Sequence, residues 1–87
     1  MIIHDADNSD WPAGRYRLTA VCAGFGSIVA NFGIGAYGEV KELAPCTNAG
    51  SVDYVEIELP TTATGLTVVL VPAGDSRAAV GYTIQKI

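Results

Sequence analysis

Charge is scarce in this chain, and positive charge most of all. Charged residues make up 16% of its 87 residues, whereas about a quarter is usual for a globular domain. Five bases stand against nine acids, which gives a net charge of -4. Proteins that bind nucleic acid gather basic side chains on one surface, and here the bases are spread along the sequence. We therefore expect no nucleic-acid partner, and attraction to an anionic membrane surface is disfavoured for the same reason.

Long hydrophobic runs are absent as well. A membrane-spanning helix needs roughly 18 consecutive apolar residues, and the longest apolar run, residues 67–73, has only the length of a strand. The sequence therefore predicts no membrane insertion. The first residues lack the basic region and the apolar segment of a signal peptide. We expect either a cytoplasmic chain or the remainder of a longer secreted precursor.

Histidine and cysteine are too few for the common catalytic and metal sites. His4 is the only histidine, and Cys22 and Cys46 are the only cysteines. This set is too small for a structural zinc site, its spacing is far from C-x-x-C, and no nucleophile–base pair is recognisable. We predict no enzyme activity and no cofactor. Two cysteines in a small β-rich chain typically form a disulfide in an oxidising compartment, so we predict a Cys22–Cys46 bridge and an extracytoplasmic location.

Hydrophobic residues, by contrast, make up 49% of the chain, and many of them are β-branched, which favours strands. In residues 14–22 the even positions from Tyr16 onward are apolar and the odd ones mainly polar, as in a strand with one buried face. We expect strands at residues 14–22, 27–32, 37–43, 52–59, 66–71 and 79–87. A short helix over residues 38–44 is the alternative to the third strand. Residues 66–71 are apolar on both faces, which predicts a strand covered twice or in contact with a partner chain.

The spacing of these runs predicts an all-β fold. Gly24-Phe25-Gly26 and Pro72-Ala73-Gly74-Asp75 are expected to be turns between strands. We predict a single antiparallel β-sandwich or jelly-roll-like domain of about six to seven strands over residues 13–87. Residues 1–12 are expected to form a polar, turn-rich N-terminal lead-in without regular structure.

Two motifs match known sites only in part. Residues 33–38 read G-x-G-x-x-G, but a nucleotide site needs a following helix and a parallel strand. Pro45 stops any such helix early, so a glycine-rich bend is the better interpretation. Asp5, Asp7 and Asp10 are a weak candidate calcium site, because calcium prefers clustered carboxylates. The EF-hand pattern fails, since its glycine and its last acidic position are missing.

The strand at residues 52–59 carries the candidate ligand contacts. Its outward side chains include Tyr54, Glu56 and Glu58, while Val55 and Ile57 face inward. An exposed aromatic ring beside carboxylates can stack on, and hydrogen-bond to, sugars or peptides. Partly covered surface tyrosines are also common without any such function.

The chain resembles small secreted β-sandwich domains of bacterial lipoproteins. The resemblance lies in the pattern from Gly14 to Gly26, in the second cysteine after Pro45, and in the final Gly81-Tyr82-Thr83-Ile84 strand. More distantly, it is similar to pre-peptidase C-terminal jelly-roll modules. This resemblance implies an extracytoplasmic, non-catalytic accessory module and no particular ligand.

Two hypotheses for function follow. The first is a disulfide-stabilised binding or accessory module with an unknown protein or glycan ligand at a bacterial cell envelope. The alternative is a structural assembly protein, such as a phage or viral surface component that packs as a homo-oligomer, in the cytoplasm or in the virion. The low charge and the two-sided apolar run at residues 66–71 favour this alternative.

Overall fold

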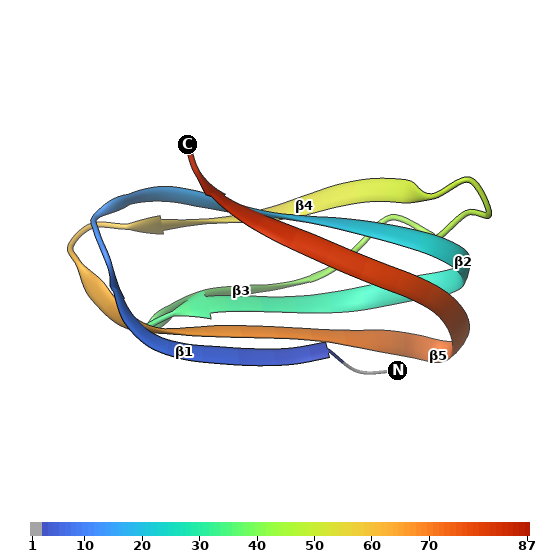
Figure 1. Cartoon of the computed structure of the whole chain (residues 1–87), viewed down its shortest axis with the longest axis horizontal. Coiled ribbons are helices and arrows are strands. Elements are labelled where there is room, and N and C mark those ends of the chain that lie inside the picture. Colours follow the sequence, from blue (N-terminus) through green and yellow to red (C-terminus); the bar gives the residue numbers. More distant parts are fainter. Residues whose placement is uncertain (1–2) are drawn as a thin grey trace.

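Alternating apolar runs produce a structure made of strands. The computed structural model describes residues 3–87, except the side chains of residues 75 and 76. The strands are β1 (Ile3–Trp11), β2 (Gly14–Ile34), β3 (Tyr37–Glu42), β4 (Ser51–Leu59) and β5 (Ala63–Lys86). All pairings between strands are antiparallel, in the order β1-β5-β2-β3, with β4 also paired to β2 (Figure 1). The predicted all-β class is confirmed.

Strands β2 and β5 are long enough to belong to two layers. The first half of β2 pairs with β4 and with the last part of β5, and its second half pairs with β3 and with the first part of β5. Figure 1 shows both strands curving at the same end of the molecule. One sheet is thus folded over on itself, which confirms the prediction of a single sandwich-like domain.

The bend in β2 was expected to be a chain-reversing turn, and that expectation was wrong. Gly24 and Gly26 have φ angles of 133° and 99°, and the register with β5 shifts between Phe25 and Ser27. Such a bulge bends a strand without ending its pairing. A Cβ atom on Gly24 would collide with the carbonyl oxygen of Arg77, so the close approach of β5 requires glycine here.

The segment Pro72–Asp75 does not reverse the chain as predicted, because β5 continues through it and is paired to β2 on both sides, at Ala73 and at Arg77. A proline-glycine segment permits either a turn or a bend. Here the antiparallel neighbour β2 decides the outcome, because it bends at the same place and Ile28 and Pro72 stay opposite each other.

Residues 3–11 form a strand, where the sequence analysis expected irregular structure. β1 pairs with β5 from Ile3 opposite Leu70 to Trp11 opposite Ala63. It lies at the edge of the sheet, and all its residues between Ile3 and Trp11 are exposed. Backbone pairing, the end residues Ile3 and Trp11 packed on the core and a few polar side-chain contacts therefore support this strand. Its exposed middle leaves no apolar alternation to detect. Residues 37–42 form β3, so the strand interpretation holds there over the helix.

The core lies between the two layers. The fully buried large side chains come from β2, β4 and β5: Phe32, Leu18, Ile28, Ile34, Leu59, Leu70 and Val68. In residues 66–71 the even positions are buried, while Val69 and Val71 face outward and are only partly covered by the described residues. The described residues include no helix long and apolar enough to cross a membrane.

Candidate functional site

A disulfide lies at one end of the sandwich, beside the bend of β2. Cys22 of β2 and Cys46 of the loop after β3 are bonded, with their Cα atoms 5.1 Å apart. The predicted bridge is confirmed, and it uses both cysteines of the chain. Backbone hydrogen bonds hold the same loop along β2, from Cys46 N to Gly26 O at 2.7 Å and from Leu43 N to Ile28 O at 2.8 Å. A disulfide is compatible with an oxidising compartment.

Next to the disulfide, Asp53 of β4 connects the edges of the two layers. Its carboxylate accepts hydrogen bonds from Lys41 Nζ at 3.1 Å, from the backbone N–H of Ala44 at 2.9 Å and from that of Tyr54 at 2.8 Å. Burial opposes ionisation, but these hydrogen bonds and the charge of Lys41 together lower the pKa of Asp53 below 3.8. Lys41 also donates to the carbonyl oxygen of Tyr54 at 2.8 Å. We call this group of residues 22, 41, 44, 46 and 53 the closed end.

The three candidate contact residues share the outer face of β4, as their alternation predicts. Glu56 lies opposite Arg17, and Glu58 lies opposite Arg15. Arg17 Nη2 is 2.7 Å from Glu56 Oε2, whereas Arg15 Nη2 is 3.6 Å from Glu58 Oε2 in a looser, more exposed pair. Glu56 is therefore neutralised locally, and Glu58 remains accessible.

Tyr54 is flanked by two cations. The Arg17 guanidinium carbon lies 4.6 Å from the ring centroid, and Lys41 Nζ lies 5.2 Å from it. Both distances are within the range of cation–π attraction. The ring is nevertheless 46% exposed, so the two cations fix its position without covering it.

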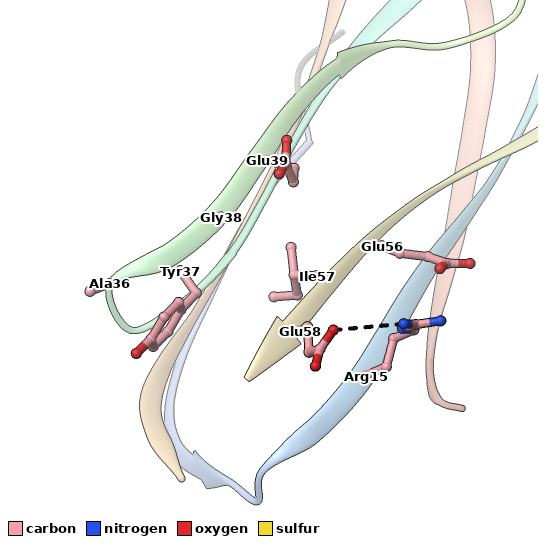
Figure 2. Close-up of a pocket in the computed structure, with 8 residues that line it drawn as sticks. All are labelled: Arg15, Ala36, Tyr37, Gly38, Glu39, Glu56, Ile57 and Glu58. Carbon is pink, nitrogen blue, oxygen red and sulfur yellow. Dashed lines mark ion pairs between the residues drawn. The ribbon is translucent and has the colours of Figure 1, made fainter. Parts of the chain in front are cut away.

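Farther along β4 the gap between the two layers opens into a cleft of about 620 Å³. The lining residues come from β2, from β4 and from the hairpin into β3: Arg15, Ala36, Tyr37, Gly38, Glu39, Glu56, Ile57 and Glu58. Figure 2 shows Ile57 between the two strand edges, with Tyr37 and Glu39 on the β3 side. We call this cleft the open end. The sequence analysis did not find it, because it depends on how β3 and β4 lie across the sandwich.

The G-x-G-x-x-G stretch turns out to form one wall of this cleft. Ile34 and Tyr37 are opposite each other in β2 and β3, which leaves Gly35 and Ala36 as a two-residue hairpin loop. Gly35 has a φ of 61°, as glycine does at the first central position of a type II′ turn. The glycine-rich bend predicted there is confirmed.

The weak calcium candidates do not assemble into a site. Asp5 accepts a hydrogen bond from the hydroxyl of Tyr82, Asp7 accepts one from Ser9 N at 2.7 Å, and Asp10 accepts one from Thr64. The register of β1 shifts between Asp7 and Asp10, which separates their environments. No group of three or more His, Cys, Asp or Glu side chains suited to a metal ion occurs in the described part of the chain.

Comparison of the chain with models of protein families, with curated proteins and with solved structures finds no significant match. The resemblance to lipoprotein and jelly-roll modules therefore stays a prediction.

Proposed function

We propose that this protein is a non-catalytic binding or accessory module of an oxidising, extracytoplasmic compartment. Its contact surface is the outer face of β4 with the neighbouring first half of β2. The observation that carries this proposal is the exposed ring of Tyr54, held between Arg17 and Lys41. The disulfide supports the compartment, because such bonds persist where the surroundings are oxidising.

This surface has the chemistry of a recognition site. An aromatic ring presents an apolar face for stacking on a sugar or on a peptide side chain. Glu58, whose side chain is 72% exposed, offers a hydrogen-bond acceptor on the same face. A ring already fixed by its neighbours loses little conformational freedom on binding, which improves affinity.

A binding screen with matched variants tests the proposal. The probes are arrays of glycans and of envelope or secreted proteins, and the variants are Tyr54→Ala and Phe25→Ala. Phe25 is 67% exposed at the bend and serves as the control for loss of an exposed aromatic side chain. We expect a ligand whose affinity falls at least tenfold in Tyr54→Ala and is unchanged in Phe25→Ala, since removal of a contact aromatic costs about 1–2 kcal/mol or more. The absence of any ligand, together with a measured hydrolase activity, would overturn it.

A second candidate, a structural subunit that packs against copies of itself, is favoured by the outer face of the other layer. Val29 lies opposite Val71, and Asn31 lies opposite both Val40 and Val69. Val40 is 66% exposed, so this face offers apolar area to a second copy. Light scattering over a concentration series tests it: assembly that Val40→Lys abolishes supports the candidate, and a monomer at high concentration contradicts it.

A further inference from the structure

Among the described residues, strand β4 is hydrogen-bonded to a single neighbouring strand, β2, and no strand pairs with its other edge. Near the closed end this edge is occupied. The Tyr54 N–H donates to the Asp53 carboxylate, and the Tyr54 C=O accepts from Lys41. Side chains thus block backbone pairing there, as natural sheet edges commonly do.

At the open end the backbone groups of β4 have no such cover. The C=O of Arg15 accepts the N–H of Ile87, beyond the β5 side of β2, so Arg15 does not use its backbone to bond Glu58 across the ladder. Along an antiparallel ladder, pairs of residues that exchange backbone hydrogen bonds alternate with pairs that do not, and Arg15 and Glu58 form a pair of the second kind. The N–H and C=O of Glu58 therefore point away from β2, and those of Glu56 do the same. Within the described residues neither residue has a backbone partner on that side.

We propose that an extended peptide with alternating basic and apolar side chains binds as an added strand along Glu56–Leu59 of β4, beside the cleft. This inference rests on the proposed binding function and names the class of partner. Strand addition takes its affinity from main-chain hydrogen bonds and its specificity from alternate side chains. Glu58 and Glu56 present the backbone groups, and the cleft receives the side chains that point toward the β3 side.

The lining of the cleft determines which side chains suit the added strand. Glu58 is only loosely paired with Arg15, and Glu39 forms no ion pair among the described residues. Both add negative charge around the cleft, and Glu58 faces the basic side chains of the added strand. Tyr37, which is 40% exposed, provides apolar surface beside the largely buried Ile57 (Figure 2), and this surface suits the apolar residues of the peptide.

The same charges disfavour a second copy of this chain at this edge. Antiparallel pairing of β4 with β4 would place Glu56 and Glu58 against the same residues of the other copy, and like charges in such positions are destabilising. The free edges of β1 and β3 carry acids too, namely Asp5 and Glu39. A basic peptide from another protein has no such conflict with a chain of net charge -4.

The test uses the full chain and a synthetic probe. The probe is a capped peptide of about six residues, a usual strand length, with alternating lysine and valine. Its affinity is measured by fluorescence anisotropy, and amide exchange is followed by NMR. We expect binding, with slower exchange at the amides of Glu56 and Glu58. An otherwise identical peptide, N-methylated at the amides facing β4, keeps its charge and should lose the binding.

Three variants separate backbone pairing from charge. Glu58→Pro removes the backbone N–H of this residue, which does not bond to β2 and would bond to the peptide, so it should abolish binding. Glu58→Gln should weaken it about two- to fivefold, the usual size of a cross-strand charge pair. Glu42→Gln removes the same charge from the end of β3, outside the cleft, and should have no effect. If Glu58→Pro fails to fold, the N-methylated peptide still decides the question.

The outcomes distinguish this inference from the proposed function. If the lysine–valine peptide does not bind while Tyr54→Ala still abolishes an array ligand, the inference is wrong and the proposed function stands. Binding that survives N-methylation is unspecific charge attraction and overturns the inference. Growth of the particle with concentration, abolished by Glu58→Pro, would show that a second copy occupies the edge and would overturn it as well.

Discussion

The two ends of the gap between β3 and β4 differ in how the edges of the two layers are connected. At both ends the edge strands of the two layers face each other, and each edge strand has backbone groups that no further strand of its layer can pair. At the closed end a disulfide and the Asp53 carboxylate bridge the gap, so the backbone of Tyr54 is fully used. At the open end the pairs Arg15–Glu58 and Arg17–Glu56 both lie within the β2–β4 layer, so among the described residues no ion pair crosses the gap there and the cleft remains.

Under the proposed function, this difference would separate stability from recognition within one strand. A small domain has a limited core, so covalent and polar connections carry a large share of its stability. Because the disulfide and the hydrogen bonds of Asp53 lie at the closed end, the side chains of the open end contribute less to stability. The side chains of the cleft could then contact the proposed partner at little cost to the fold.

Removal of the disulfide is the largest expected change. The double variant Cys22→Ala/Cys46→Ala should lower the free energy of unfolding by about 3 kcal/mol, because the bridge closes a loop of about 25 residues. Urea unfolding of the variant, and of the native protein with and without reductant, measures the loss. An unchanged midpoint after complete reduction would contradict the assignment of stability to this bond.

Amide exchange in the same variant tests the contrast between the ends. The N–H groups of Cys46 and Leu43, bonded to Gly26 and Ile28, should exchange faster without the disulfide. The N–H of Gly35 is bonded to Gly65 at the other end. Its exchange rate should be unchanged when the two proteins are compared at conditions equally far from their own unfolding midpoints. Equal acceleration at all three sites would mean that the two ends are not independent.

Removal of the Asp53 carboxylate should have the next largest effect. Asp53→Ala leaves two backbone N–H groups without their acceptor and removes one of the two acceptors of Lys41, which should cost about 1–2 kcal/mol. Glu58→Ala is the matched control, because its exposed pair should contribute less than about 0.5 kcal/mol. Urea unfolding near neutral pH compares them. A larger loss in Glu58→Ala would reverse the roles assigned to the two ends.

The pH dependence follows from the lowered pKa of Asp53. Because the folded state lowers this pKa below 3.8, the contribution of Asp53 to stability is complete above the ordinary value. It is lost as the pH falls through the lower, folded value. The difference in stability between the native protein and Asp53→Ala, measured by urea unfolding at a series of pH values, should therefore shrink in acid.

The sequence predicted what depends on local alternation. Val55 and Ile57 are buried, Tyr54 and Glu58 are exposed, and the even positions of residues 16–22 face the core. Period-two patterns specify the face of a strand without reference to its neighbours. The outer face of β4 could therefore be named before its partners were known.

What the sequence did not predict depends on neighbours distant in the chain. Gly24 and Gly26 permit a turn or a bend, and the choice is made by β5, which bends with β2. β1 has too few buried side chains to show a pattern. The cluster around Asp53 combines β3, the loop and β4, and no local signal links Lys41 to Asp53 before the register of the strands is known.

The opposite side of the sandwich allows the smallest effect to be measured cleanly. There Tyr82 of β5 donates its hydroxyl to Asp5 of β1. Partial burial, with the hydrogen bond and charge of Asp5, raises the pKa of Tyr82 from 10.0 to about 12. In absorbance titration, one tyrosine should ionise near pH 12, and this late step should disappear in Tyr82→Phe.

Because the folded pKa is raised, the contribution of this contact is complete below pH 10 and lost as the pH rises toward 12. Its loss at neutral pH in Tyr82→Phe should be under about 1 kcal/mol, since the bond is exposed. Acid thus weakens the β3–β4 side through Asp53, and alkali weakens the β1–β5 side through Tyr82. A titration in which Tyr82→Phe leaves the late step unchanged would show that this second connection does not form.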